Sequence, residues 1–236
     1  MDNQGTPSYQ TSGFNTNINR FVPGGYIVGA FANQRSFVRT VTPGDPDRNP
    51  IQVAINEANR LGGGVVNIGI GTYVLGSQIN LFNNVFVNGQ DSQNTVIDCN
   101  GGTYGFVLVG SSGNSKNNVV INNLKIINST RGSVIDFRFV DYSLISNCIF
   151  SNNYGSAQDA STAGDINLSD TSFCRVENNT SSGGEFFAST RGTHLLISNN
   201  LINTYRIDGT ATIHIRINKS YKLFIKLQNL VFVHNL

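Results

Sequence analysis

Residues 121–124 read Ile121-Asn122-Asn123-Leu124, and a similar pattern returns three times further along the chain. The later copies are Ile145-Ser146-Asn147-Cys148, Val176-Glu177-Asn178-Asn179 and Ile197-Ser198-Asn199-Asn200, with a weaker fifth in Leu227-Gln228-Asn229-Leu230. With Asn123, Asn147, Asn178, Asn199 and Asn229 as equivalents, the steps are 24, 31, 21 and 30 residues. Repeats of this length are typical of solenoids. We therefore predict stacked β-coils, one of them lengthened by an insertion at residues 152–164.

Asparagine suits the corners of such a coil. It tolerates the left-handed backbone conformation that a sharp turn requires. Stacked coils would place one asparagine above another at the interstrand spacing, where side-chain amides form hydrogen bonds along the stack. The alternative is an antiparallel sandwich of hairpins, whose turns favour Asn-Gly or Asp-Gly; Asn88-Gly89 and Asn100-Gly101 are the main examples here. The repeat favours the solenoid.

A single amphipathic helix is predicted before the repeats. Asn49 is a suitable N-cap and Pro50 suits the first helical position. An apolar stripe and three terminating glycines follow: Ile51, Ala54, Ile55, Ala58 and Leu61, then Gly62, Gly63 and Gly64. Beyond the glycines, short β-rich runs alternate with Asn, Gly and Ser to the end of the chain.

The first 45 residues differ in composition from the rest. They are polar and irregular, apart from an apolar patch at Tyr26–Phe31, and prolines at positions 43, 46 and 50 mark a boundary. We predict an irregular segment over 1–45 and a β-helix domain over 46–236. The outward positions of the repeated strand, Val120, Leu144 and Leu196, are apolar, while Arg175 interrupts them. We expect residues 1–45 or another subunit to cover this row.

The stretch from Ile51 to Asp98 carries a resemblance to a known family. It combines the helix, the three glycines, a strand at Val65–Ile70 and further runs at Val85–Gly89 and Thr95–Asp98. With the later repeats, it resembles the right-handed parallel β-helix superfamily, which includes pectate lyases, polygalacturonases and phage tailspikes. The resemblance implies an all-β, right-handed parallel β-helix capped by the N-terminal helix, and it keeps a homotrimer open. No catalytic motif of these enzymes is matched, so no catalytic residue is carried over.

Composition excludes several functions. Only 13% of the 236 residues are charged, the net charge is +2 and no basic cluster exists, so neither nucleic acid nor an anionic membrane is an expected partner. No signal peptide or transmembrane run is seen, while the family resemblance favours an extracellular or virion-surface protein. The three cysteines, Cys99, Cys148 and Cys174, have no metal-type spacing and are expected in the core.

A second strand in each coil is predicted to carry the functional residues. These strands are Val134–Arg138, Asp165–Ser169, Glu185–Ser189 and Ala211–Ile217. Alternation sends Ile135, Phe137, Ile166 and Leu168 inward. The expected outward residues are Asp136, Arg138, Asp165, Asn167, Ser169, Glu185, Phe187, Ser189, His214 and Arg216. Carboxylates, guanidinium groups and an aromatic side chain suit a carbohydrate groove, although ordinary solvated surface has a similar composition.

We therefore predict that the chain binds a polysaccharide and consider whether it also cleaves one. Asp165 and Glu185 on neighbouring coils would lie about 5 Å apart, which suits the two carboxylates of a retaining glycosidase or a shared Ca²⁺. In a lyase, His214 is the candidate base. The expected substrate-binding residues are Asp136, Arg138, Asn167, Phe187 and Arg216. The alternatives are a non-catalytic structural or adhesive fibre that binds glycans or proteins, and a truncated or degenerate copy of an enzyme.

Overall fold

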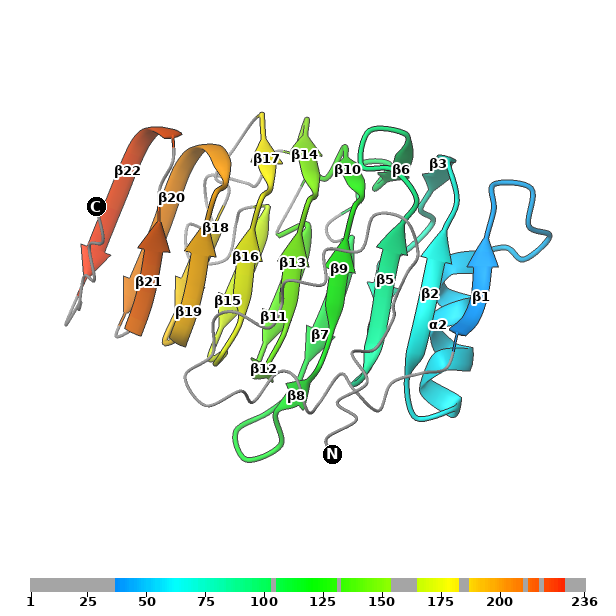
Figure 1. The fold of residues 1–236 in the computed structure, drawn as a ribbon, viewed down its shortest axis with the longest axis horizontal. Helices are drawn as coiled ribbons and strands as arrows, with labels where there is room; N and C mark the ends of the chain where they lie inside the picture. Colours follow the sequence, from blue (N-terminus) through cyan, green and yellow to red (C-terminus); the bar gives the residue numbers. More distant parts are fainter. Residues whose placement is uncertain are drawn as a thin grey trace, which may run out of the picture.

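The computed structural model of this chain is a parallel β-solenoid (Figure 1). The structure describes residues 37–102, 105–130, 133–153, 165–182, 187–209, 212–216 and 219–227. Within these residues the only α-helix is α2, and the rest is strands and corners. The predicted all-β parallel β-helix is therefore confirmed. None of the helical structure in the described residues is long and apolar enough to cross a membrane.

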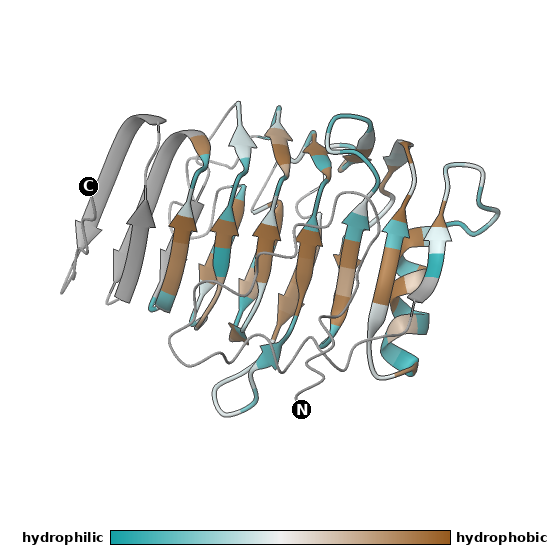
Figure 2. Cartoon of the chain, in the orientation of Figure 1, coloured by the Kyte–Doolittle hydropathy of each residue, from teal (hydrophilic) through white to brown (hydrophobic). Residues whose placement is uncertain are grey.

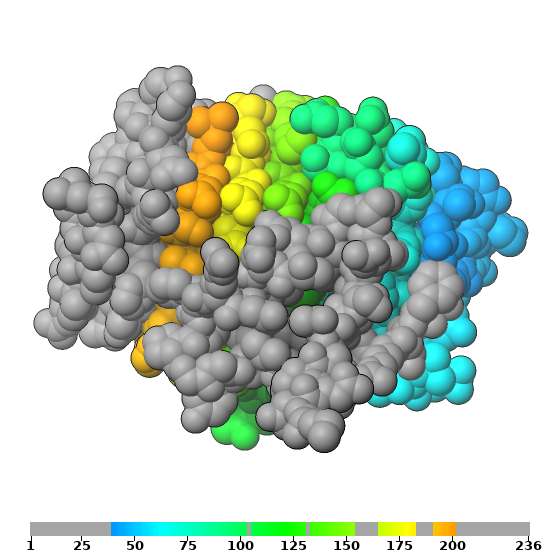
Figure 3. All heavy atoms as spheres, in the orientation of Figure 1, coloured from blue at the N-terminus to red at the C-terminus, as the bar shows by residue number. Residues whose placement is uncertain are grey.

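Three faces form the wall of the solenoid, and the first is an eight-stranded sheet that we call sheet A. Its neighbouring strands are parallel, and each belongs to the next coil (Figure 1). In order they are β1 (Phe37–Val41), β2 (Gly64–Ile68), β5 (Val85–Gly89), β9 (Val120–Asn122), β13 (Leu144–Ser146), β16 (Arg175–Glu177), β19 (Thr193–Ser198) and β21 (Thr212–Arg216). Figure 3 shows the coils side by side in sequence order.

The second and third faces are joined in one 12-stranded sheet because β20 (Leu201–Gly209) runs across both. The second face holds β3 (Gly71–Val74), β6 (Thr95–Asp98), β10 (Lys125–Ile127), β14 (Ile149–Ser151) and β17 (Thr180–Ser181). The third face holds β4 (Ile79–Asn80), β7 (Phe106–Val109), β11 (Ile135–Arg138), β15 (Ile166–Ser169) and β18 (Phe187–Thr190). The last strand, β22 (Lys219–Leu227), pairs with β20, and a short pair joins β8 (Lys116–Asn117) to β12 (Val140–Asp141).

Helix α2 (Pro50–Arg60) forms as its capping residues predict. The Asn49 side chain accepts a hydrogen bond from the Gln52 amide, which satisfies one of the unpaired N–H groups of the first turn. The residues Ile51, Ala54, Ile55 and Ala58 are buried in the main core, while Leu61 lies beyond the last turn and is exposed. The helix therefore caps the β1–β2 end of the solenoid with a narrower apolar stripe than expected (Figure 1).

The coil register confirms four of the five predicted repeats. Ile121, Ile145, Val176 and Ile197 pair in succession along sheet A, so the corner asparagines that follow them are equivalent. The next strand of sheet A is β21, where Ile215 pairs with Ile197. The last described coil is therefore shorter than predicted, and the fifth repeat at Asn229 lies outside the described residues.

The four corner asparagines all have the left-handed conformation, with φ of 61° at Asn123, 53° at Asn147, 58° at Asn178 and 55° at Asn199. The side chains of the first two, however, bond elsewhere: Asn123 donates to the Gly89 carbonyl, and Asn147 donates to Asn122 Oδ1. The bonds that run along the stack lie one residue earlier. There Asn122 donates to Asn88, Asn88 donates to Asn67, and Ser146 donates to Asn122.

Replacing Asn147 by alanine should lower the free energy of unfolding by about 1–3 kcal/mol, since it removes the bond to Asn122 and strains a left-handed backbone. Replacing it by glycine, which tolerates this backbone conformation, should cost less. Urea denaturation of both variants measures the difference. An unchanged midpoint for Asn147→Ala would contradict the role of this corner.

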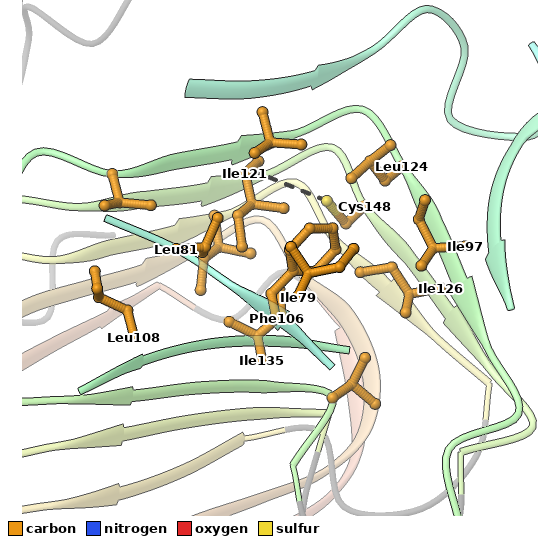
Figure 4. Close-up of a cluster of buried hydrophobic side chains, with 14 of the residues drawn as sticks. Ile79, Leu81, Ile97, Phe106, Leu108, Ile121, Leu124, Ile126, Ile135 and Cys148 are labelled. Atoms are coloured by element: carbon orange, nitrogen blue, oxygen red, sulfur yellow. Dashed lines mark hydrogen bonds between the residues drawn. The ribbon is translucent and has the colours of Figure 1, made fainter. Parts of the chain in front are cut away.

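The core fills the space between the three faces. Figure 4 shows Ile121 from sheet A, Ile97 and Ile126 from the second face, and Phe106 and Ile135 from the third face, all converging on one cluster. Cys99, Cys148 and Cys174 are buried free thiols, as predicted from their spacing, and burial raises the pKa of each to about 12. Figure 2 shows hydrophobic residues along the strands of sheet A and hydrophilic residues at the corners.

Candidate functional site

The predicted polar stripe begins on β11 and β15 of the third face. These two strands pair so that Asp136 lies opposite Asn167 and Arg138 lies opposite Ser169. The intervening residues, Ile135, Phe137, Ile166 and Leu168, are buried in the main core. The predicted alternation is therefore confirmed for both strands. It places the four polar residues on the outer side of the wall.

Four side chains form one hydrogen-bonded network, which we call the β11–β15 network: Asp136, Arg138, Asn167 and Ser169. Arg138 contacts both carboxylate oxygens of Asp136, with Nε 3.1 Å from Oδ1 and a terminal nitrogen 2.8 Å from Oδ2. Asn167 Nδ2 donates to Asp136 Oδ1 at 2.7 Å, and Ser169 Oγ donates to Asn167 Oδ1 at 3.2 Å. Such two-point contact fixes the direction of the guanidinium group.

Exposure differs sharply within this network. Asp136 is 2% exposed and Asn167 is fully buried, whereas 39% of the Arg138 side chain is exposed. Asp136 is therefore a positioning residue whose oxygens are occupied by Arg138 and Asn167. Arg138 is the group through which the network presents charge at the surface.

The predicted catalytic residue Asp165 lies inside the solenoid. Its carboxyl accepts hydrogen bonds from Ser181 Oγ at 2.5 Å and from Asn153 Nδ2 at 3.0 Å, and the residue is 1% exposed. Ser181 pairs with the core residue Phe150, so this contact is on the inner side of the wall. The expected outward position was wrong because β15 begins at Ile166. Asp165 belongs to the corner before it, where strand alternation does not apply.

Burial dominates the electrostatics of Asp165. Removal from water raises the pKa of its carboxyl to about 8, although the hydrogen bonds from Ser181 and Asn153 oppose that rise. The carboxyl group is therefore largely protonated at neutral pH. Its predicted partner Glu185 lies outside the described residues, so the pairing of these two carboxyl groups stays a prediction.

Four other predicted residues lie at different register positions from those expected. Phe187 pairs with the core residue Ile166 and not with Asn167. Ser189 likewise pairs with the core residue Leu168, so β18 is displaced by one residue from the predicted alignment. His214 and Arg216 lie on β21, where they pair with Leu196 and Ser198 of sheet A. The Ala211–Ile217 run does contain a strand, but the short last coil places that strand on another face. A strand pattern alone does not say to which face the strand belongs.

The structure continues the third face through a strand that the sequence analysis missed. Strand β20 places Arg206 opposite Ala188 and Asp208 opposite Thr190. These positions therefore share the rows of Asp136 and Arg138 respectively. The alternation of Tyr205, Arg206, Ile207 and Asp208 was the available signal for this strand.

The predicted Ca²⁺ site would need several ligating side chains close together. Within the part of the chain that the structure describes, no three His, Cys, Asp or Glu side chains come together in a way that could hold a metal ion. The carboxyl of Asp165, proposed as one ligand of a shared Ca²⁺, instead contacts Ser181 and Asn153.

No family model matches the chain, and no curated protein matches it. A crystal structure from Parabacteroides merdae ATCC 43184, provisionally named a glycosyl hydrolase, has 15% identity and a TM-score of 0.32, covering 74% of this chain and 93% of its own. A likeness of this extent carries no argument about function.

Proposed function

We propose that this β-solenoid binds an acidic polysaccharide along its third face, with Arg138 as the main charged contact. The observation that carries the proposal is the β11–β15 network. Asp136 and Asn167 are buried and orient a guanidinium group that remains 39% exposed. A fixed guanidinium group suits the bidentate recognition of a carboxylate such as that of a uronate.

The geometry of the third face supports a chain-like ligand. Arg138, Ser169, Thr190 and Asp208 follow one another on adjacent strands. Adjacent strands are about 4.8 Å apart, so these four positions span about 14 Å along the solenoid axis. A polymer bound at Arg138 would extend along this row over the following coils. The extended row is the reason for preferring a polysaccharide to a small ligand.

Binding is favoured over cleavage by the state of two carboxyl groups at this face, those of Asp136 and Asp165. Both oxygens of Asp136 are engaged, and Asp165 is directed into the interior. Within the proposal, the chain is an extracellular or virion-surface protein of the pectate lyase-like and tailspike-like kind. Catalysis by Asp165, Glu185 and His214 stays a prediction that the assay below also tests.

Replacing Arg138 by glutamine should weaken binding to a uronate polymer by about 10- to 100-fold, because a hydrogen bond to a charged group contributes about 1.5–3 kcal/mol. Isothermal titration with polygalacturonate, alginate and neutral dextran measures this effect. The matched control is Arg60→Gln, which makes the same charge change on the exposed end of α2, and it should bind as the unmodified chain does.

Equal affinities for Arg138→Gln and Arg60→Gln would refute the proposed site, as would tighter binding of dextran than of the uronate polymers. The same mixtures should be followed for ultraviolet-absorbing unsaturated products and for new reducing ends. Either product would add cleavage to binding. The variant Glu185→Gln would then test the predicted acid.

A further inference from the structure

A second hydrophobic cluster lies on the outer side of sheet A. It consists of Phe86, Val120 and Leu144, with Val65 and Tyr142 packed against it. These side chains point away from the core because their neighbours Val87, Ile121 and Ile145 belong to the main core. Register pairing aligns Val65, Phe86, Val120, Leu144 and Arg175 in one row across successive coils.

This outer face is covered. Val120 is 0% exposed and Phe86 only 1%, so these outward-pointing apolar side chains have other atoms packed over them. The polar row two residues further on is also buried, including Asn88, Asn122 and Ser146. Arg175 and Glu177 continue the cover, since they form a 2.7 Å ion pair whose side chains are 8% and 13% exposed. The cover therefore extends over about 14 Å, from β5 to β16, at the usual strand spacing.

The described elements do not account for this cover. They are the solenoid wall itself and the helix α2, whose apolar residues pack into the interior core at the β1–β2 end. The Tyr142 ring stacks on Phe173 at 4.9 Å, and Phe173 stacks on His194 at 4.6 Å, but these three residues occupy a corner beside sheet A. Residues outside the described set must supply the cover.

We infer that residues 1–36 cover the outer face of sheet A as an intramolecular strap, with the apolar patch Tyr26–Phe31 on the Phe86–Val120–Leu144 cluster. The segment joins the solenoid at β1, which is the first strand of sheet A. Leu144 lies four strands from β1, or about 19 Å, while 36 extended residues reach about 120 Å. The segment contains only three charged side chains, Asp2, Arg20 and Arg35, which suits an apolar surface.

The other undescribed stretches are poorly placed for this role. Residues 154–164 leave β14 on the second face and return to β15 on the third face, at the corner that sheet A does not share. Residues 228–236 follow β22 at the far end. Their nine residues reach about 30 Å, which is little more than the distance of about 24 Å from β21 to β5 alone. The remaining gaps are four residues or fewer.

A thiol-accessibility experiment on the full chain tests the strap. The variant Val120→Cys should react with Ellman's reagent slowly, because its side chain is covered. Adding Tyr26→Asp and Ile27→Asp should accelerate that reaction at least tenfold. The native cysteines provide an internal measure of folding, since all three are buried.

Two control variants are needed for comparison, one with an accessible thiol and one with charges outside the apolar patch. Val109→Cys, at a position that is 48% exposed on the third face, gives the rate for an accessible thiol. The double change Asn33→Asp and Gln34→Asp, made in the Val120→Cys variant, adds the same charge outside the apolar patch. The Val120→Cys thiol should then still react slowly with Ellman's reagent. Fast reaction in the single Val120→Cys variant would overturn the proposal, as would slow reaction after the Tyr26 and Ile27 changes. Acceleration on simple dilution would instead identify a second copy of the chain as the cover.

A cross-linking measurement guards against loss of folding in the aspartate variants. Cysteine is placed singly at Tyr26, Ile27, Val28 or Phe31 in the Val120→Cys background, and mild oxidation is followed by mass spectrometry of the digested chain. At least one position should form an intramolecular disulfide with the Val120→Cys thiol. Absence of such a product at all four positions would overturn the inference.

Discussion

Replacing Asn179 by alanine is expected to lower the free energy of unfolding by about 4 kcal/mol. The side chain is 1% exposed and lies at an inner corner of the solenoid. Its amide donates to the Ile145 carbonyl at 3.1 Å and to Asn200 Oδ1 at 3.0 Å, and its oxygen accepts from the Cys148 N–H at 2.9 Å. Alanine would leave at least two buried backbone groups without these partners, each at a cost of about 1–3 kcal/mol.

The neighbouring residue supplies the control. Asn178 is exposed and left-handed, so Asn178→Ala should cost only the backbone strain of about 1 kcal/mol. Urea denaturation followed by circular dichroism compares the two variants. Equal destabilisation by Asn178→Ala and Asn179→Ala would show that the inner hydrogen bonds of Asn179 do not stabilise the coil stack.

Asp165 is expected to make the protein less stable as the pH rises from 5 to 8. Its folded pKa of about 8 lies well above the ordinary value near 3.8 that applies when the chain is unfolded. Between these values the folded chain holds a proton that the unfolded chain has released, so the free energy of unfolding falls by up to about 1.4 kcal/mol per pH unit. The stabilisation is complete below about pH 4 and is lost as the pH approaches 8.

The isosteric variant Asp165→Asn removes this titration. Relative to the variant, the unmodified chain should lose on the order of 4 kcal/mol between pH 5 and pH 8, as measured by urea denaturation at each pH. The control Asp170→Asn changes the same chemical group where it is paired with Arg191 at the surface. In this variant the free energy of unfolding should depend on pH as it does in the unmodified chain. Parallel pH profiles for the unmodified chain and Asp165→Asn would contradict the buried position of this carboxyl.

The coil architecture follows from local features of the sequence. The cap and apolar stripe of α2 depend on residues within four positions of one another, so the sequence predicted the helix near residues 50–61, one residue longer than the observed Pro50–Arg60. The corners at Asn123, Asn147, Asn178 and Asn199 were predicted for the same reason, since a left-handed turn selects asparagine through its own backbone. The alternation of Ile135, Asp136, Phe137 and Arg138 likewise assigned inner and outer sides within one strand.

The site depended instead on how the coils stack. The outward order of Asp136, Arg138 and Asn167 was predictable because each residue lies inside a strand, whereas Asp165 lies one residue before β15 and turns into the interior. His214 and Arg216 lie on sheet A because the step from Ile197 to Ile215 is 18 residues, shorter than the earlier repeats suggested. Side-chain alternation is set within a strand, but the face and neighbours of that strand depend on the length of every preceding corner. For that reason local sequence patterns predicted the solenoid, its corners and a cover over the apolar row of sheet A, whereas the stacking of the coils placed Asp136 against Arg138 and turned Asp165 into the interior.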